Sequence, residues 1–400
     1  MKPHTLLRAA LLSCALTTPA MAQDAKTPIK IGAMVDLTTT YADIGGMGSV
    51  EAVRMAIEDF GGSVLGRPVE VVFADGQNKP DVAAGIARQW YDSGVEMITD
   101  LPASGIALSV MQLARDKKKL ALVTSAGSSD ITGKFCSPYA AHWTWDTYSM
   151  AHGTGRNVVL AGGKTWFFLT ADYVFGKSLE ADTTAVIKQN GGSVLGDALH
   201  PLGTSDFSSY LLQAQASGAN VVGLANGGTD MINSVKQAHE YQLPQSGQKL
   251  AALIAFITDI HSLGLETAQG LQLTSAFYWD QDDATRAWSQ RMFARRHAMP
   301  SMTQAGAYSA TLHYLQSVKA AGTLDADKVM EKMRALPIND FMSHNAHLRI
   351  DGRVERDMYL FEVKKPSESH GEWDLYKLVS VIPAAEATRP LHDGGCPLVH

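Results

Sequence analysis

The sequence is poor in the features that mark membrane, nucleic-acid-binding and disordered proteins. The N-terminal apolar run is far too short for the roughly 20 residues of a membrane span, and no later segment is that long and uncharged. Charged residues make up 18% of the chain and the formal net charge is -6, which argues against the basic clusters that bind nucleic acid or anionic membranes. Apolar residues make up 46%, which is typical of a globular protein. We therefore expect neither a nucleic-acid partner nor insertion into a membrane.

Motifs of the common enzyme classes are also missing. The chain has no G-x-S-x-G elbow, no H-E-x-x-H helix and no P-loop. His344 and His347 are three residues apart, but no cysteine or acidic ligand set lies beside them in the sequence, which favours a surface pair over a metal site. The sequence therefore predicts no catalytic residue, no metal and no cofactor, and we do not expect an enzyme.

The N-terminal segment predicts export. Lys2 and Arg8 precede the apolar run 9–16. Ala20-Met21-Ala22 then supplies the small residues that a signal peptidase requires. We predict that residues 1–22 form a cleaved signal peptide. The mature chain is then expected to work outside the cytoplasm.

Cysteine is scarce, with three in the whole chain. Cys14 leaves with the predicted signal peptide, and its surroundings match a lipoprotein cleavage box only faintly, so we do not expect a lipid anchor. Cys136 and Cys396 remain as an even pair in an oxidising compartment, where such pairs commonly form disulfides. We predict a Cys136–Cys396 disulfide over the alternative of two separate thiols.

The mature chain alternates short apolar runs with longer amphipathic ones, which predicts βαβ units on parallel sheets. Its length favours two cores rather than one. A first set contains predicted strands at 29–34, 69–73, 96–100 and 120–124, and helices at 48–60, 80–93 and 104–117. A second set contains predicted strands at 165–170, 193–199, 221–225 and 250–254, and helices at 176–190, 207–217 and 230–241. The remaining elements are expected at 271–277, 284–297, 304–321, 324–336, 348–350, 359–363 and 374–381.

A short repeat supports two similar halves. The segments 61–66 and 191–196 both read Gly-Gly-Ser-Val-Leu-Gly, and each follows the first helix of its set. The predicted fold class is α/β, with two doubly wound, Rossmann-like lobes that have parallel sheets and a cleft between them. We assign 27–145 plus 277–345 to lobe I, 146–276 plus 346–385 to lobe II, and 386–400 to a tail that returns to lobe I.

Several segments match one known family in order along nearly the whole mature chain. They are 29–34, 51–52 with 61–62, 65–69, Asp75, 172–176, 204–208 and 235–238. With these segments the chain resembles the periplasmic solute-binding proteins of ABC transporters, of the branched-chain amino acid (Leu/Ile/Val-binding) type. The resemblance implies a type I periplasmic binding fold, in which three crossovers form a hinge and the lobes close on a ligand.

The resemblance also implies what the protein works with. It predicts a periplasmic, monomeric binding subunit that captures a small molecule and delivers it to a membrane permease with its ATPase subunits. A ligand-sensing receptor module with the same fold is the alternative of another class. Receptors of that kind need a membrane span or a fused output domain, and the chain ends soon after its last predicted strands.

Candidate polar ligand-binding residues follow from strand order. Ligands of doubly wound sheets lie beyond the carboxyl ends of strands, against helix N-termini. Ser104 follows the strand 96–100, and Asn226 follows the strand 221–225. Ser125, Ala126 and Ser128 follow the strand 120–124, and hydroxyl and free N–H groups at such places suit a carboxylate. The alternative is that the serines only cap helices.

The resemblance favours an aromatic acid over an aliphatic amino acid. Family members that bind aliphatic amino acids hold the ammonium group partly with an acidic residue after the last second-lobe strand, and Phe256 occupies that position here. Asp259 takes the place of the acidic residue if the alignment shifts by one helical turn. The segments 142–146 and 391–397 resemble a branch associated with benzoate- or cinnamate-type carboxylates.

Aromatic residues near the expected cleft agree with a planar ligand, since such residues stack on rings. We predict that four aromatic residues contact the ligand: Trp143, Tyr173, Phe175 and Phe256. Trp145 and Phe277 are assigned to the core. His142 is a candidate donor to the ligand carboxylate. A structural hydrogen bond is the alternative for this histidine.

Overall fold

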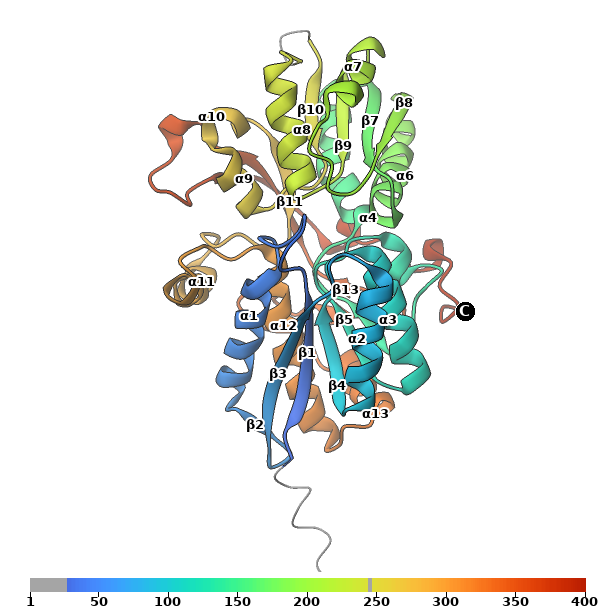
Figure 1. Cartoon of the computed structure of the whole chain (residues 1–400), viewed down its shortest axis with the longest axis vertical. Helices are drawn as coiled ribbons and strands as arrows, with labels where there is room; N and C mark the ends of the chain where they lie inside the picture. The colour runs from blue at the N-terminus through green and yellow to red at the C-terminus, as the bar shows by residue number, and fades with distance from the viewer. Residues whose placement is uncertain (1–26, 244–246) are drawn as a thin grey trace, which may run out of the picture.

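The computed structural model describes residues 27–243 and 247–400, and the predicted signal peptide at 1–22 lies outside these residues. Figure 1 shows two α/β halves stacked along the long axis of the molecule, each with its own sheet. The first half begins at the N-terminal strand, and the second half holds the middle of the chain. None of the helices within the described ranges is both long and apolar enough to cross a bilayer.

The first half is built on a sheet of order β2-β3-β1-β4-β5-β6, in which β2 is antiparallel to β3 and the other pairs are parallel. Helix α1 packs on α12, and α2 packs on α3. The strands are β1 (Ile29–Val35), β2 (Ser63–Val64), β3 (Arg67–Asp75), β4 (Val95–Asp100), β5 (Leu120–Val123) and β6 (Ala140–His142). The helices are α1 (Gly46–Phe60), α2 (Pro80–Asp92), α3 (Ser104–Lys117), α11 (Asp283–Arg296), α12 (Met302–Ala321) and α13 (Ala326–Ala335).

The second half has a parallel sheet of order β10-β9-β7-β8. Its strands are β7 (Thr165–Ala171), β8 (Ser193–His200), β9 (Val221–Ala225) and β10 (Lys249–Ala252). Its helices are α4 (Thr147–Met150), α5 (Arg156–Leu160), α6 (Val174–Gln189), α7 (Ser208–Ala216), α8 (Thr229–Glu240), α9 (Ile257–Leu263) and α10 (Leu265–Ala268). In each sheet the second long strand of the chain lies on one side of the first long strand, and the third and fourth lie on its other side. This is a doubly wound order. The predicted fold class is confirmed.

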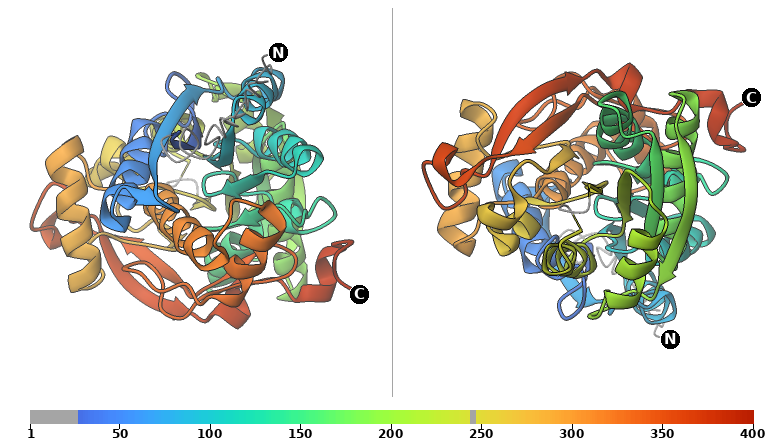
Figure 2. Two further views of the ribbon diagram at one scale, coloured as in Figure 1. Left: turned by 90° about the horizontal axis from the view of Figure 1, so that it is seen from below. Right: turned by 90° about the horizontal axis from the view of Figure 1, so that it is seen from above.

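The left view of Figure 2 looks at the molecule from the side of the first half, and the right view looks from the side of the second half. The chain leaves the first half after β6, returns between β11 (Gln272–Ser275) and α11, and crosses again before β14 (Met358–Val363). Strands β11, β14 and β15 (Tyr376–Ile382) form an antiparallel sheet. The remaining short elements are β12 (His347–Leu348), β13 (Val354–Glu355) and α14 (Ala384–Ala387).

The hairpin of β12 and β13 lies against the first sheet. The amide of His142 donates to the carbonyl of Gly352 over 2.7 Å, and His142 forms a parallel bridge with Arg353. The predicted lobe boundaries place Gly352 and Arg353 in lobe II and His142 in lobe I. The domain boundaries stay a prediction, and this contact shows where the third crossing adjoins the first half.

Local sequence accounts for the elements that carry the site. Helix α1 buries Val50, Val53 and Ile57 at helical spacing, and it ends where Gly61 adopts a φ of 104°. Strands β4, β5 and β9 are almost entirely buried, as expected for parallel strands covered on both faces. These buried strands fix the loops at their carboxyl ends, and those loops form the site described below.

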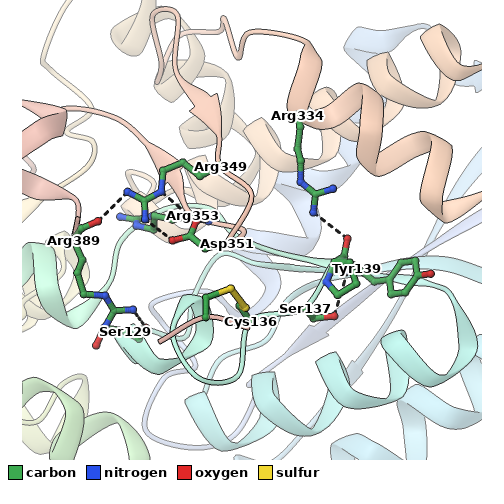
Figure 3. The surroundings of a disulfide bond; sticks show 11 residues. Ser129, Cys136, Ser137, Tyr139, Arg334, Arg349, Asp351, Arg353 and Arg389 are labelled. Carbon is green, nitrogen blue, oxygen red and sulfur yellow. Dashed lines mark hydrogen bonds and ion pairs between the residues drawn. A yellow bond between two sulfur atoms is a disulfide. The ribbon is translucent and has the colours of Figure 1, made fainter. Parts of the chain in front are cut away.

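The predicted Cys136–Cys396 disulfide is confirmed, with a Cα–Cα distance of 5.6 Å. It links the C-terminal tail to the segment between β5 and β6, as Figure 3 shows. In the same region Arg389 donates to the carbonyl of Ser129 over 2.9 Å, so the tail is held by more than the disulfide. The two cysteines are 260 residues apart in the sequence. In the chain-entropy account, a bond that closes such a long loop strongly constrains the unfolded chain.

We expect Cys396→Ser to lower the free energy of unfolding by about 2–4 kcal/mol, because the unfolded chain regains the entropy that the bond removes. Urea unfolding followed by tryptophan fluorescence measures the change. Dithiothreitol is the matched control, since it should destabilise the wild type and leave the variant unaffected. Equal unfolding midpoints of the two proteins under oxidising conditions would contradict this prediction.

Candidate ligand-binding site

A narrow cavity with about 20 Å³ of free volume lies between the two halves. Its walls come from loops at the carboxyl ends of β1, β4 and β5 in the first half and of β7, β9 and β10 in the second. This is the place where doubly wound sheets bind ligands. The lining residues are Tyr41, Ile44, Gly45, Pro102, Ser104, Ser125, Gly127, Trp145, Tyr173, Phe175, Gly227, Ile254 and Phe256.

Two serine hydroxyl groups lie on the wall of the first half. Helix α3 begins at Ser104, so the amides of its first turn have no acceptor within the helix. The Ser104 hydroxyl oxygen accepts a hydrogen bond from the amide of Ser128 over 3.1 Å, which leaves its own O–H free to donate. The Ser125 hydroxyl instead contacts the Oδ1 atom of Asp100, a buried residue behind the wall.

The opposite wall is aromatic. The ring of Trp145 meets Phe175 and Phe256 edge to face, with centroid distances of 5.8 Å to each. Trp145 is buried, and within the described residues its Nε1–H has no acceptor. A Cβ on Gly127 would lie 2.3 Å from the Trp145 ring, so glycine is required for the ring to lie there. These rings form an apolar wall with one free donor.

Hydrogen bonds between the halves close the cavity. The hydroxyl groups of Tyr41 and Tyr173 are 2.5 Å apart, and these residues belong to different halves. Beside them, the amide of Thr229 donates to the carbonyl of Thr40 over 3.3 Å. The structure therefore shows the closed arrangement of the two halves.

The cavity wall contains no charged side chain, and several helices begin at it. All thirteen lining residues are uncharged. Four helices of at least twelve residues, α1, α3, α6 and α8, begin at or beside lining residues. Because helix N-termini carry partial positive charge, they stabilise an anion placed between them.

Asp259 does not line the cavity. Its Oδ2 atom accepts the amide of Phe256 over 3.0 Å, and the residue caps α9 from a buried position. Burial raises the pKa of Asp259 to about 7. Phe256, not Asp259, presents its side chain to the cavity, so the arrangement offers no carboxylate at this place for a ligand ammonium group.

The structure brings five of the predicted ligand-binding residues together. Ser104, Ser125, Tyr173, Phe175 and Phe256 all line the cavity. Their contact with a ligand stays a prediction. They come from both halves, as a ligand-closed cleft requires.

The other five predicted residues lie behind the cavity walls. Ala126 and Ser128 are buried in the loop after β5, where Ser128 caps a short 3-10 turn. Asn226 is buried, and its Nδ2 atom donates to the Ser234 hydroxyl over 3.0 Å.

His142 and Trp143 are also buried. The Nε2 atom of His142 lies 2.7 Å from the carbonyl of Ala126, and burial lowers the histidine pKa to about 4. A neutral ring that donates to this carbonyl fits the structural alternative. Trp143 is held by α12, where its Nε1–H donates to the Ser309 hydroxyl over 2.9 Å.

Several cavity-lining residues were not selected from the sequence. Trp145 was assigned to the core, although it lines the cavity. The others, Tyr41, Ile44, Gly45, Pro102, Gly127, Gly227 and Ile254, lie in loops. The rule that selected Ser104 and Ser125 also applies to the loops after β1 and β10, so position after a strand is the signal that identifies Tyr41 and Ile254.

Comparisons with known proteins agree with this arrangement. The sequence matches the model of the periplasmic binding protein family over residues 28–370. A crystal structure of a periplasmic binding protein from Burkholderia mallei is 50% identical, with a TM-score of 0.91 over 93% of this chain and 99% of that chain. A branched-chain amino acid ABC transporter periplasmic ligand-binding protein from Burkholderia xenovorans LB400 is 41% identical, with a TM-score of 0.83 over 93% and 100% of the two chains.

A more distant structure shares the fold. It is an ABC transporter solute-binding protein from Rhodopseudomonas palustris BisB5 in complex with 3,4-dihydroxybenzoic acid, which is 20% identical, with a TM-score of 0.80 over 90% of this chain and 98% of that chain. The two lobes, the interlobe cavity and the match over most of the sequence lead to one family. The chain belongs to the periplasmic binding proteins of the ABC-transporter type.

Proposed function

We propose that the protein captures a small aromatic carboxylate in the periplasm, after removal of its signal peptide, and delivers it as a monomer to an ABC permease. The observation that carries this proposal is the uncharged, aromatic-walled cavity at which four longer helices begin. A carboxylate is stabilised there by helix N-termini and by the Ser104 hydroxyl. The side chains of Trp145, Phe175 and Phe256 supply aromatic surface against which the ring of such an acid can pack.

An amino acid is disfavoured by its ammonium group. A buried cation without a partner costs several kcal/mol, and no carboxylate lines this cavity in the described part of the chain. The neighbour from Burkholderia xenovorans is described as a branched-chain amino acid binder, and its 41% identity makes such an amino acid the second candidate. The dihydroxybenzoic acid complex supports the first, because that protein holds a single-ring acid on the same fold.

The proposed mechanism is a shift between open and closed populations. The ligand exchanges freely in the open form and contacts both halves only after closure. Its binding free energy then favours the closed state, in which Tyr41 and Tyr173 meet. A ligand-sensing role with the same closure remains the alternative of another class, and transport of the bound acid into cells that carry the permease distinguishes the two.

We expect benzoate, 4-hydroxybenzoate or 3,4-dihydroxybenzoate to bind the mature protein, whereas leucine and valine do not. Phe256→Glu should weaken binding of the aromatic acid at least tenfold, because it places a negative charge against the ligand ring, inside a small cavity that also has to hold the ligand's own charge. Isothermal titration calorimetry measures both effects. Phe73→Glu is the matched control, since Phe73 is 40% exposed and lies on β3 outside the cavity. Tight binding of leucine without binding of any aromatic acid would overturn the proposed function.

A further inference from the structure

We propose that Asp100 is a positioning residue for ligand capture, and that the Ser125 hydroxyl donates to a ligand carboxylate only while a proton resides on the Asp100 carboxyl group. Binding of the anion then takes up one proton from solvent. The inference rests on the proposed function, because it requires a carboxylate ligand. It deepens that function by making capture depend on pH.

The first step of the argument is the contact between the two side chains. Oδ1 of Asp100 lies in hydrogen-bond contact with Oγ of Ser125, and Ser125 lines the cavity while Asp100 is fully buried behind it. A serine hydroxyl has one proton to donate. An ionised Asp100 can only accept hydrogen bonds, so the Ser125 O–H donates to it. Ser125 then presents only its oxygen lone pairs to the cavity. Lone pairs repel a carboxylate.

The second step is the reversal of this hydrogen bond. A protonated Asp100 donates from Oδ1 to the Ser125 oxygen, and the Ser125 O–H becomes free to rotate toward the ligand. No bond other than hydrogen bonds changes, and the proton that is taken up stays on Asp100. Ser104 provides the contrast, because it accepts from a backbone amide and its O–H is free at any pH.

The third step is the charge around Asp100. Among residues 27–243 and 247–400 no lysine, arginine or histidine forms an ion pair with it. The charged group that faces Asp100 is Asp36, from the loop after β1, and Ser49 on α1 is the other polar neighbour. Burial raises the pKa of Asp100 to about 7. The hydrogen bond from Ser125 lowers this pKa, and the like charge of Asp36 raises it further.

The backbone at this point is strained. Asp100 and Leu101 have φ values of 71° and 63°, in the left-handed region that non-glycine residues rarely adopt. The carbonyl of Asp100 accepts the amides of Thr124 and Ser125, each over 3.1 Å. This conformation holds the Asp100 side chain directly behind Ser125, which agrees with a role at the site.

Calorimetry with 4-hydroxybenzoate at pH 8 in phosphate and in Tris tests the proposal, because the two buffers differ in ionisation enthalpy. We expect the wild type to take up close to one proton per ligand, and its affinity to fall about tenfold for each pH unit above 7. Asp100→Asn should take up no proton and bind with pH-independent affinity, since its amide donates permanently to Ser125. Ser104→Ala is the control, which should lose affinity and keep the proton uptake.

Ser125→Ala gives a second readout if Asp100→Asn unfolds, because it should also abolish proton uptake. Binding of 4-hydroxybenzoate by the wild type without proton uptake would overturn the role of Asp100 and leave the proposed function standing. Failure of benzoate, 4-hydroxybenzoate and 3,4-dihydroxybenzoate to bind at any pH from 5 to 9 would overturn both.

Discussion

Asp146→Asn is expected to lower the free energy of unfolding by about 3–5 kcal/mol, because it leaves a buried guanidinium group without its partner. The Nε atom of Arg353 lies 2.9 Å from Oδ2 of Asp146, and the two side chains are 2% and 3% exposed. Asp146 also caps α4 by accepting the amide of Ser149 over 2.8 Å. Asparagine is an equally good cap, so the substitution removes the charge and keeps the cap.

Chemical unfolding at pH 7 measures this loss, and Asp92→Asn is the matched control. Asp92 pairs with Lys117 over 2.5 Å, but its side chain is 59% exposed, so its ion pair is screened by water. A loss for Asp146→Asn no larger than that of Asp92→Asn would contradict the prediction. An Asp146→Leu/Arg353→Met double variant should recover part of the loss, since it removes both buried charges.

The same ion pair sets the acid side of stability. Burial alone raises the pKa of Asp146, but the charge of Arg353 prevails and holds it below its ordinary value. A carboxyl group with a lowered folded-state pKa contributes stability that is present above about pH 4 and is lost as the pH falls through the lowered pKa. This pair lies at the first crossing between the halves, so its loss in acid should weaken the packing at that crossing.

The sequence predicted best the elements with a clear period or a long buried run. Helix 104–117 and strand 221–225 have the predicted bounds. The six-residue repeat was less informative. Residues Ser63 and Val64 form the short strand β2, and a turn at Leu65 with a φ of 54° follows them, whereas the second copy continues through Gly196 inside β8. The same six residues therefore take two conformations, because pairing partners decide which one is stable.

Part of the site lies in a short irregular segment, where side-chain direction does not follow a regular sequence pattern. Trp143 and Trp145 are two residues apart, and in a strand both would face the same side. Strand β6 ends at His142 and α4 is capped by Asp146, so the segment between them does not alternate. Trp143 turns to Ser309 on α12 and Trp145 to the cavity. The direction of Trp143 depends on a helix residue 166 positions away, which a local pattern does not contain.

Gly228→Ala should weaken binding of 4-hydroxybenzoate by about 100-fold or more, because it obstructs the closed state. Gly228 belongs to the second half and has a φ of 61° and a ψ of -138°. A Cβ there would lie 2.3 Å from the carbonyl oxygen of Thr40 in the first half. Backbone cannot yield as a flexible side chain can, so the halves must separate, whereas the open form is free of the contact.

Gly218→Ala separates closure from backbone strain. Gly218 has a φ of 66° in the same half, but no atom lies within 4 Å of the position that its Cβ would take. Gly218→Ala costs roughly 1–2 kcal/mol of stability through the left-handed backbone. Gly228→Ala costs more, because its φ and ψ lie in a region that residues other than glycine rarely adopt, and only Gly228→Ala also blocks contact between the halves. Calorimetry should therefore show nearly wild-type affinity for Gly218→Ala, and small-angle scattering with ligand should show a larger radius of gyration for Gly228→Ala alone. Equal affinities of the two variants would mean that capture does not need the contact between Thr40 and Gly228, and the population shift would then have to depend on the Tyr41–Tyr173 contact instead.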